Sequence, residues 1–255
     1  MSQHISTDKD QDFAYKKRSL FGRRQGRAVK GERAGALATV LPQIETPKDK
    51  LKEDHKTQPS SIFNKQYSKY CLEIGFGHGE RLIIDAHRSP ETAFIGAEPF
   101  INGMADFLKH IQDDIPDNIR VLMDDGMIIA DSLYPSSLDK IYILNPDPWH
   151  KKRHHKRRLI NQMTLDVFAK ILKPGGKLVM TSDVENLAEW MCTHACIHPN
   201  FQWLAKSKSD WNNAPENWIP TRYEQKGAKG AKKICLLYTS PSPRDQRGSR
   251  MPSSA

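Results

Sequence analysis

A glycine-rich loop beside an acidic side chain is the first feature of the chain that could support chemistry. The loop, Gly75-Phe-Gly-His-Gly79, follows the apolar run Tyr70-Cys-Leu-Glu-Ile74 and precedes a segment with helical periodicity. Such a loop brings backbone N–H groups, here those of Gly75 and Gly77, and a helix N-terminus up to a ligand. Its G-x-G-x-G spacing differs from the G-x-G-x-x-G of dinucleotide-binding loops. Glu73, just before the loop, would repel a pyrophosphate and attract a positively charged group.

Further acids end the next two apolar runs. Glu98 ends the second run, where a carboxylate can accept hydrogen bonds from both hydroxyls of a ribose. Asp124 and Asp125 end the third, and one of the two can accept a hydrogen bond from the exocyclic amine of an adenine. Any one of these acids could instead cap a helix, because aspartate is favoured there. The first three apolar runs therefore each have an acid at or near their end. Glu73 in particular favours S-adenosyl-L-methionine, whose amino-acid end carries an ammonium group, over NAD.

The fourth apolar run leads into a carboxylate between two prolines and then into a basic block. The run Ile141-Tyr-Ile-Leu144 continues as Asn145-Pro-Asp-Pro-Trp149. The prolines exclude helix and central strand around Asp147, so its carboxylate is held rigidly at the rim of a site, as catalysis requires. Residues 150–158 then hold six Lys or Arg and three His, which suits contacts with RNA phosphates. The alternative is a solvated helix start, but cations there oppose the helix macrodipole, which favours an external anion.

The elements that position these residues alternate between short apolar strands and helices. This alternation is typical of a parallel sheet covered on both faces, so we predict a doubly wound α/β domain over residues 65–234. The Lys173-Pro-Gly-Gly176 turn ends one helix, because proline cannot continue it and glycine supplies a positive φ. The predicted strands are 70–74, 94–97, 120–123, 140–144 and 177–181. The predicted helices are 79–87, 101–111, 126–133, 158–172 and 186–195.

The two ends of the chain differ from this domain. Residues 1–64 lack a sustained apolar period, and the window from Lys16 to Arg33 holds eight Lys or Arg against one acid. We predict a basic, flexible arm there, which is either a solvated leader or an RNA contact. Residues 235–255 resemble translated vector sequence or a disordered tail, so we predict no packed structure and no function for them.

Composition limits the class of protein. The chain of 255 residues has a net charge of +9 and a pI near 9.3, which favours polyanionic partners. No apolar run is long enough to span a membrane or forms a signal peptide, so we expect a cytoplasmic protein, as a monomer or weak dimer. Cys192, His194, Cys196 and His198 crowd together in the sequence. On one helix, Cys192 and Cys196 share a face that His194 does not, and we expect no metal site.

The series of motifs resembles the bacterial tRNA (guanine-N7-)-methyltransferases. The resemblance extends from Tyr67 to Lys233 and is most specific at Pro146-Asp-Pro-Trp149 and the basic block. It implies the Rossmann-like fold of the class I methyltransferases, S-adenosyl-L-methionine as methyl donor, and tRNA as substrate, methylated at N7 of the variable-loop guanine m7G46. The other motifs that carry it are Leu72-Glu-Ile-Gly-Phe-Gly-His-Gly79, Gly96-Ala-Glu98, Asp125, Thr181-Ser-Asp183 and Thr221-Arg-Tyr-Glu224.

The resemblance also implies roles for the matched residues. Asp147 would be the catalytic residue and would line the cofactor pocket together with Glu73, Glu98 and Asp125. The family closes its sheet with a final strand, which the tail after residue 234 replaces in this sequence. The implied nucleoside or RNA contacts are Lys151, Asp183, Thr221, Arg222, Tyr223 and Glu224. From the basic block itself we expect phosphate contacts by Arg153, Lys156, Arg157 and Arg158.

Two alternatives stay open on the sequence alone. A nicotinamide-dependent oxidoreductase could use the glycine loop and Glu98, but it explains neither Glu73 nor the basic block. A non-catalytic RNA-binding protein on a methyltransferase-like scaffold would not require these acids. If guanine is the substrate, Asp147 and Asp183 are both candidates to accept from its N1–H and N2 amino groups.

Overall fold

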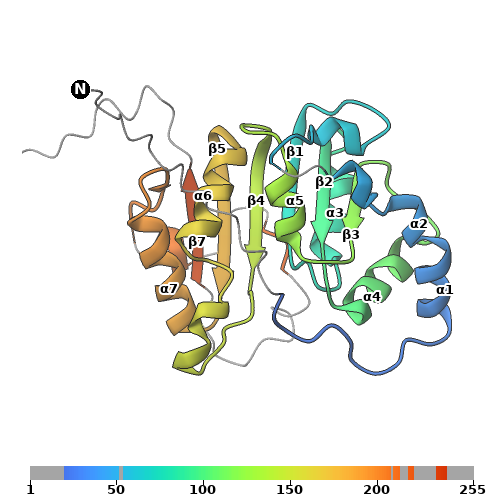
Figure 1. The fold of residues 1–255 in the computed structure, drawn as a ribbon, viewed down its shortest axis with the longest axis horizontal. Helices are drawn as coiled ribbons and strands as arrows, with labels where there is room; N and C mark the ends of the chain where they lie inside the picture. The colour runs from blue at the N-terminus through green and yellow to red at the C-terminus, as the bar shows by residue number, and fades with distance from the viewer. Residues whose placement is uncertain (1–19, 52–53, 208, 213–217, 221–233, 240–255) are drawn as a thin grey trace, which may run out of the picture.

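A mostly parallel β-sheet forms the centre of the molecule (Figure 1). The computed structural model describes residues 20–51, 54–207, 209–212, 218–220 and 234–239. Within these residues the sheet has seven strands in the order β3-β2-β1-β4-β5-β7-β6. The first five strands along the chain pair in parallel and confirm the predicted strands and the doubly wound α/β fold. They are β1 (Lys69–Ile74), β2 (Thr92–Ala97), β3 (Ile119–Leu122), β4 (Leu138–Leu144) and β5 (Leu172–Ser182).

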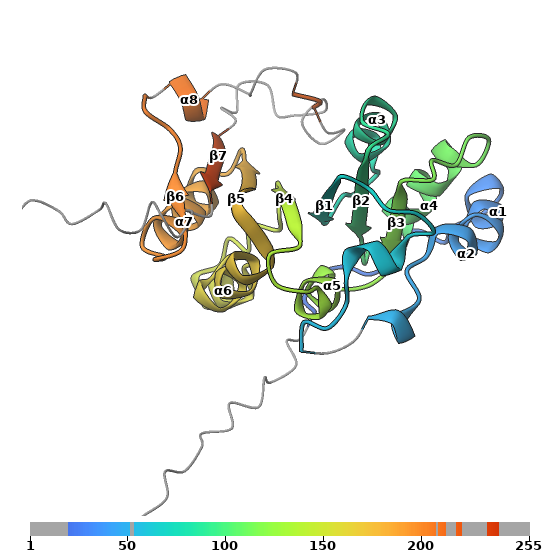
Figure 2. The ribbon, with the colours of Figure 1, turned by 90° about the horizontal axis from the view of Figure 1, so that it is seen from above.

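Helices cover both faces of the sheet (Figure 2). Helices α5 (Gly126–Ser132), α6 (Gln162–Ile171) and α7 (Glu185–Cys196) pack on one face. Helices α3 (Glu80–Arg88) and α4 (Ile101–Ile111) pack on the other. The shorter elements are α1 (Glu32–Thr39), α2 (Leu41–Ile44), α8 (Ser209–Asn212) and the 3-10 helices η1 (Lys48–Lys50), η2 (Pro59–Ile62) and η3 (Lys152–Arg157). None of the described helices is long and apolar enough to cross a membrane.

Residues 32–64 do not form the flexible arm that the sequence predicted. Helices α1 and α2 pack beside α4 and the edge strand β3. Their apolar side chains Ala36, Val40, Leu41 and Ile44 are buried. The Thr46 N–H donates to the Val121 carbonyl at 2.7 Å, which ties the chain to β3. These apolar residues recur at helical spacing, but the high charge of the surrounding window hid the pattern.

The end of the sheet also differs from the prediction. Strand β7 (Ile234–Thr239) pairs antiparallel with β5 over six residue pairs, from Ser182↔Ile234 to Lys177↔Thr239. Strand β6 (Gln202–Trp203) pairs with β7 on its other side. The final strand that the tail was expected to replace is therefore present. An apolar six-residue run rich in β-forming side chains satisfies the requirements of a strand, whatever its origin.

The strand order reverses at the centre of the sheet, and we call the region outside the carboxyl ends of β1 and β4 the crevice. Along the chain the strands proceed from β1 outward to β2 and β3, and then return to β4 on the other side of β1. Ligands of doubly wound sheets bind at such a reversal, outside the carboxyl ends of the strands. The glycine loop after β1 and the proline-flanked Asp147 after β4 both lie at this end.

Candidate active site at the carboxyl ends of the strands

The glycine loop connects β1 to α3 and is held against α4 on one side. Gly75 donates its N–H to the Ala97 carbonyl at 2.8 Å, so the loop begins close to the end of β2. Gly79 has φ 73°, and a Cβ there would collide with the ring of Phe107, so only glycine fits. A Cβ at Gly75 or Gly77 would meet no atom within 4 Å. The loop therefore borders open space at the two glycines that the sequence assigned to the cofactor.

Glu98, at the end of β2, is buried with 6% of its surface exposed. Its Oε2 accepts from the Gly77 N–H at 2.6 Å, and its Oε1 accepts from the Phe100 N–H at 2.8 Å. Burial is the main cause that raises the pKa of Glu98 to about 7, and the nearby carboxylates of Asp147 and Glu73 add to the rise. The structure thus brings three of the predicted site acids close enough to affect one another's ionisation.

Glu73 is more deeply buried than the sequence indicated, and it has a cationic partner. The Arg81 Nη1 donates to the Glu73 Oε2 at 3.1 Å, and both side chains lie in the protein interior. Arg81 stands in the first turn of α3. Sequence reasoning missed it, because the two residues are eight positions apart on different elements. The signal that could have found it is an arginine in the first turn of the helix that directly follows the glycine loop.

The two aspartates after β3 have different surroundings. Asp125 is the N-cap of α5, and its Oδ1 accepts from the Met127 N–H at 3.0 Å. Asp124 instead forms ion pairs with Lys48 at 2.7 Å and Arg24 at 3.2 Å. The helix-capping alternative therefore applies to Asp125. Because capping uses Oδ1, its other carboxylate oxygen is the one that a ligand would contact.

Asp147 lies in a loop whose backbone is fixed at both ends. Asn145 and Trp149 have φ 48° and 47°, in the left-handed region, which asparagine adopts more readily than most residues and tryptophan seldom adopts. Asn145 donates its N–H to the Thr181 carbonyl at 2.9 Å, which joins the loop to β5. Asp147 as a residue is exposed, yet partial enclosure of its carboxyl group raises its pKa. The loop therefore holds Asp147 at the carboxyl end of β4, with its carboxyl group partly exposed to solvent.

The basic block is not the start of a long helix. Residues 152–157 form η3, and α6 begins only at Gln162, with a capping box between Asn161 and Thr164. The argument from the helix macrodipole therefore does not apply to these cations. Lys151, Arg153 and Lys156 are exposed, as phosphate contacts require. Arg157 lies with its guanidinium carbon 5.1 Å from the centre of the Trp149 ring.

Arg158 is buried, with 2% of its surface exposed, so the prediction that it contacts RNA phosphates is wrong. Its Nε donates to the Pro148 carbonyl at 3.0 Å, and its Nη2 donates to the Asn186 Oδ1 at 2.6 Å. Its guanidinium lies 5.0 Å from the ring centre of Trp190. A side chain enclosed in this way cannot reach an RNA backbone. Arg158 instead joins the Asp147 loop to α7.

A segment near the N-terminus crosses the same end of the sheet, which the sequence did not predict. We call residues 20–31 the strap. Arg24 accepts from the Ile101 N–H at 2.9 Å through its carbonyl, and the Gly26 N–H donates to the Asn102 Oδ1 at 2.7 Å. A Cβ at Gly22 would lie 3.1 Å from the Asp147 Oδ2. In Figure 1 the strap runs past the end of the sheet at which β4 ends and continues to α1.

The remaining predicted residues are only partly described. Asp183 directly follows β5, at the same end of the sheet as Asp147, and is partly exposed. Thr221, Arg222, Tyr223 and Glu224 lie outside the described residues.

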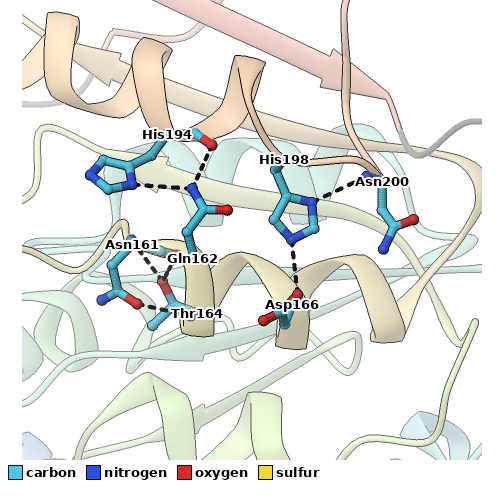
Figure 3. Close-up of polar contacts among 7 residues, drawn as sticks. All are labelled: Asn161, Gln162, Thr164, Asp166, His194, His198 and Asn200. Atoms are coloured by element: carbon cyan, nitrogen blue, oxygen red, sulfur yellow. Dashed lines mark hydrogen bonds and ion pairs between the residues drawn. The ribbon is translucent and has the colours of Figure 1, made fainter.

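The histidines near the end of α7 hold two helices together (Figure 3). The Gln162 Nε2 of α6 lies 3.2 Å from the His194 Nδ1, and the His198 Nε2 lies 3.1 Å from the Asp166 Oδ1. The Cys192 and Cys196 sulfur atoms are 3.8 Å apart. In the part of the chain that the structure describes, no group of three or more His, Cys, Asp or Glu is placed to hold a metal ion. The crowding of cysteine and histidine in the sequence thus reflects helix packing, at a distance from the glycine loop.

The sheet order, the glycine loop after β1 and the acid after β2 are those of the class I S-adenosylmethionine-dependent methyltransferases. A family model described as "Putative methyltransferase" matches residues 67–237. The chain is 39% identical to the tRNA (guanine-N(7)-)-methyltransferase of Brucella anthropi over 220 residues, which cover 86% of this chain and 93% of that protein. It is 36% identical to the enzyme of the same name from Rhodospirillum rubrum, over 88% of each chain. The chain belongs to the tRNA (guanine-N(7)-)-methyltransferase family.

Solved structures of lower similarity include the aminoglycoside resistance methyltransferase NpmB1. It aligns with a TM-score of 0.47 at 14% identity, over 69% of this chain and 89% of that chain.

Proposed function

We propose that the protein transfers the methyl group of S-adenosyl-L-methionine to N7 of a guanine in tRNA. The target is the variable-loop guanine at position 46, and the product is m7G46. The observation that carries this proposal is the position of Asp147. Its carboxylate stands at the rim of the crevice, near Glu98 on the cofactor side and directly before the exposed cations of the basic block. A single loop therefore connects a site for a methyl donor with a surface for RNA.

The acids around the crevice suit the parts of the donor. Glu98 can accept from the two ribose hydroxyls, and Asp125 can accept from the adenine amine through the oxygen that does not cap α5. Glu73 can bind the ammonium group while Arg81 holds its carboxylate from one side. The open space beside Gly75 and Gly77 gives the donor room against the loop. When bound, the donor supplies an electrophilic methyl group.

The protein's own contribution to the reaction is orientation and electrostatics. Guanine N7 already carries an in-plane lone pair, so no strong base is needed. Asp147 or Asp183 can accept hydrogen bonds from the N1–H and N2 amino groups of guanine, which aims N7 into the crevice. A carboxylate fixed by a rigid loop also stabilises the positive charge that develops on the imidazole ring of the base.

The RNA would be bound by exposed cations around the Asp147 loop. Lys151, Arg153 and Lys156 are accessible and can contact phosphates. Trp149, beside the guanidinium of Arg157, offers a surface on which a base can stack. The strap adds further positive charge at the same rim. The proposed tRNA surface therefore borders the proposed methyl-donor site.

A methyl-transfer assay tests the proposal. The protein is mixed with S-adenosylmethionine carrying a labelled methyl group and with unmodified tRNA, and the labelled nucleoside is identified. We expect 7-methylguanosine in native-sequence tRNA and none in a matched transcript with adenine at position 46. Tight tRNA binding without methyl transfer would favour a non-catalytic RNA-binding protein. Label at another base would contradict the assigned position, and a hydride transfer to a nicotinamide would contradict the class.

A further inference from the structure

Arg81 is a buried cation in the wall of the proposed methyl-donor site. Only 5% of its surface is exposed. Its Nη1 donates to the Glu73 Oε2 at 3.1 Å, and its Nη2 donates to the Asp85 Oδ2 at 2.6 Å. A buried ion pair contributes little net stability, because desolvation of the charges offsets their attraction. Stability alone is thus a weak reason for a charged cluster at this position.

Aromatic rings fix the plane of the Arg81 guanidinium. Its central carbon lies 3.6 Å from the ring centre of Tyr142 on β4 and 5.5 Å from that of Trp218. Tyr142 is the direct neighbour of Glu73 across the sheet, in the register between β1 and β4. A planar guanidinium stacked on a ring has few orientations available. Arg81 therefore holds the Glu73 carboxylate in one position.

The charges around Glu73 show why it needs such a partner. Glu98 on β2 lies close enough to interact with it electrostatically, and Asp147 adds a third carboxylate nearby. Asp85 on α3 is a fourth acid in the cluster, bound by Arg81 itself. Carboxylates that share a poorly solvated site disfavour each other's ionisation. Arg81 is the cation that the described residues place directly on Glu73.

We propose that Arg81 is a positioning residue for the methyl donor: it keeps Glu73 ionised and oriented to bind the ammonium group at the donor's amino-acid end. The inference rests on the proposed function, because it takes the donor to bind beside the glycine loop. Arg81 does not touch the donor in this proposal. It acts through Glu73, whose carboxylate binds the guanidinium and the ligand at the same time.

The groups that face Glu73 decide how this role depends on pH. Among the residues that the structure describes, these groups include Arg81 and Asp85 on α3, Tyr142 on β4 and Glu98 on β2. Burial lowers the pKa of Arg81, but Glu73, Tyr142 and Asp85 more than compensate and raise it, so Arg81 stays charged. Burial raises the pKa of Tyr142, which stays neutral. Glu98 titrates near neutral pH, but it meets the ribose and not the amino-acid end.

Two ligands separate the amino-acid end from the rest of the donor. S-adenosylhomocysteine carries the ammonium group, whereas methylthioadenosine has the same adenosine portion and lacks the amino-acid end. The ratio of their dissociation constants, measured by calorimetry on the complete protein, therefore reports on Glu73. The titration of Glu98 affects both ligands and cancels in the ratio.

In Arg81→Met we expect S-adenosylhomocysteine to bind about tenfold more weakly at pH 6.5, with methylthioadenosine unchanged within about twofold. In wild type the ratio should stay constant between pH 6.5 and pH 8.5, because Arg81 stays charged throughout this range. In a Glu73→Gln background the Arg81→Met change should have no further effect on the ratio, since the residue through which it acts is gone.

Two further variants serve as controls for the effect of Arg81→Met. Arg88→Met removes an exposed arginine from the same helix and should leave both affinities unchanged. Arg81→Lys retains the charge and should keep part of the preference if Arg81→Met folds poorly. Equal weakening of both ligands, or an unchanged ratio in Arg81→Met, overturns the role of Arg81. Wild-type protein that binds neither ligand overturns the proposed donor site itself, and the inference with it.

Discussion

Two buried arginines, Arg81 and Arg158, stand on opposite sides of the crevice and differ in what surrounds them. Arg81 lies among carboxylates, and these raise its pKa although burial lowers it. Arg158 instead donates to the Pro148 carbonyl and the Asn186 amide oxygen, and desolvation lowers its pKa. Arg81 contacts its acid directly. Arg158 reaches Asp147 only through the backbone of the neighbouring proline.

The comparison separates two ways in which a protein can prepare an acid for chemistry. On the proposed cofactor side the acids are buried close together, and Glu73 has a cationic partner in Arg81, whereas Glu98 accepts hydrogen bonds from backbone N–H groups. On the substrate side Asp147 is exposed to solvent and needs no such partner, but its loop must be kept in place. We therefore expect changes near Arg81 to appear in pH-dependent ligand binding, and changes near Arg158 to appear in turnover.

Removal of the substrate-side acid itself should have the largest effect. In Asp147→Ala we expect kcat to fall on the order of a hundredfold or more, because the carboxylate that orients guanine and stabilises its developing charge is removed. The affinity for S-adenosylhomocysteine should fall much less than kcat, because Asp147 is only one of four acids that line the proposed cofactor pocket. Single-turnover methylation and calorimetry on the same preparation measure the two quantities. Near-normal turnover in a folded variant would contradict the catalytic role.

Removal of the loop anchor should have the next largest effect. Arg158→Met leaves the Pro148 carbonyl and the Asn186 amide oxygen without their charged donor, which costs about 3 kcal/mol of unfolding free energy. We expect kcat to fall roughly tenfold to a hundredfold, since a small displacement of Asp147 suffices for that decrease. Arg158→Lys should restore little, because an ammonium cannot bond both acceptors in the same plane.

Arg153→Met is the matched control for Arg158, because it removes an exposed arginine from the same block. Denaturant unfolding and the salt dependence of tRNA binding distinguish the two residues. Arg158→Met should lower the free energy of unfolding and leave the salt slope of tRNA binding unchanged. Arg153→Met should leave the free energy of unfolding unchanged and reduce the salt slope. If Arg158→Met reduced the salt slope instead, its assignment as an anchor would be wrong.

The exposed cations of the basic block should affect affinity and not chemistry. Replacement of Lys151, Arg153 and Lys156 by glutamine should reduce the slope of log K against log salt by about 2 to 3, close to one for each phosphate that these side chains neutralise. At saturating tRNA, kcat should stay near the wild-type value. Filter binding over a salt series measures the slope, and an unchanged slope would place the RNA elsewhere.

The contrast between the two arginines also explains what the sequence could and could not predict. The five parallel strands and the positions of the glycine loop, Glu98 and Asp147 follow from local patterns, because apolar runs, glycines and prolines act within a few residues. The partners of Arg81 and Arg158 depend on contacts between distant elements. In the sequence Arg158 is one cation among six, and only its burial distinguishes it from its neighbours.

Residues 32–51 and 235–239 were mispredicted for a related reason, whereas residues 1–19 and 240–255 lie outside the part of the chain that the structure describes. Composition dominated the interpretation of residues 1–64 and 235–255, yet a few well-placed apolar residues decide whether a segment packs. Val40 and Ile44 bury α1 and α2 against the sheet edge, and Tyr238 is fully buried in β7. The strap has no apolar pattern at all. It is held by backbone and Asn102 hydrogen bonds, which leave no periodicity in a sequence.

The smallest predicted effect concerns Glu98, the buried acid of the cofactor side that has no cationic partner among its described contacts. Its pKa of about 7 means that the carboxyl group is mostly protonated below that pH. Only the ionised form accepts hydrogen bonds from both ribose hydroxyls. We therefore expect methylthioadenosine to bind roughly tenfold more tightly at pH 8 than at pH 6, and Glu98→Gln to remove this dependence.

The raised pKa of Glu98 also determines how the stability of the folded protein changes with pH. The folded-state pKa of Glu98 lies above its ordinary value of 4.5, so the stability linked to its protonation is fully present below pH 4.5 and is lost as the pH rises through 7. Without ligand, Glu98→Gln should therefore unfold at a higher temperature than wild type at pH 8 and lose this advantage at pH 5. A variant that is less stable than wild type at pH 8 would show that the hydrogen bonds from Gly77 and Phe100 outweigh the cost of burying the charge. In that case the fold itself would stabilise the ionised form of Glu98.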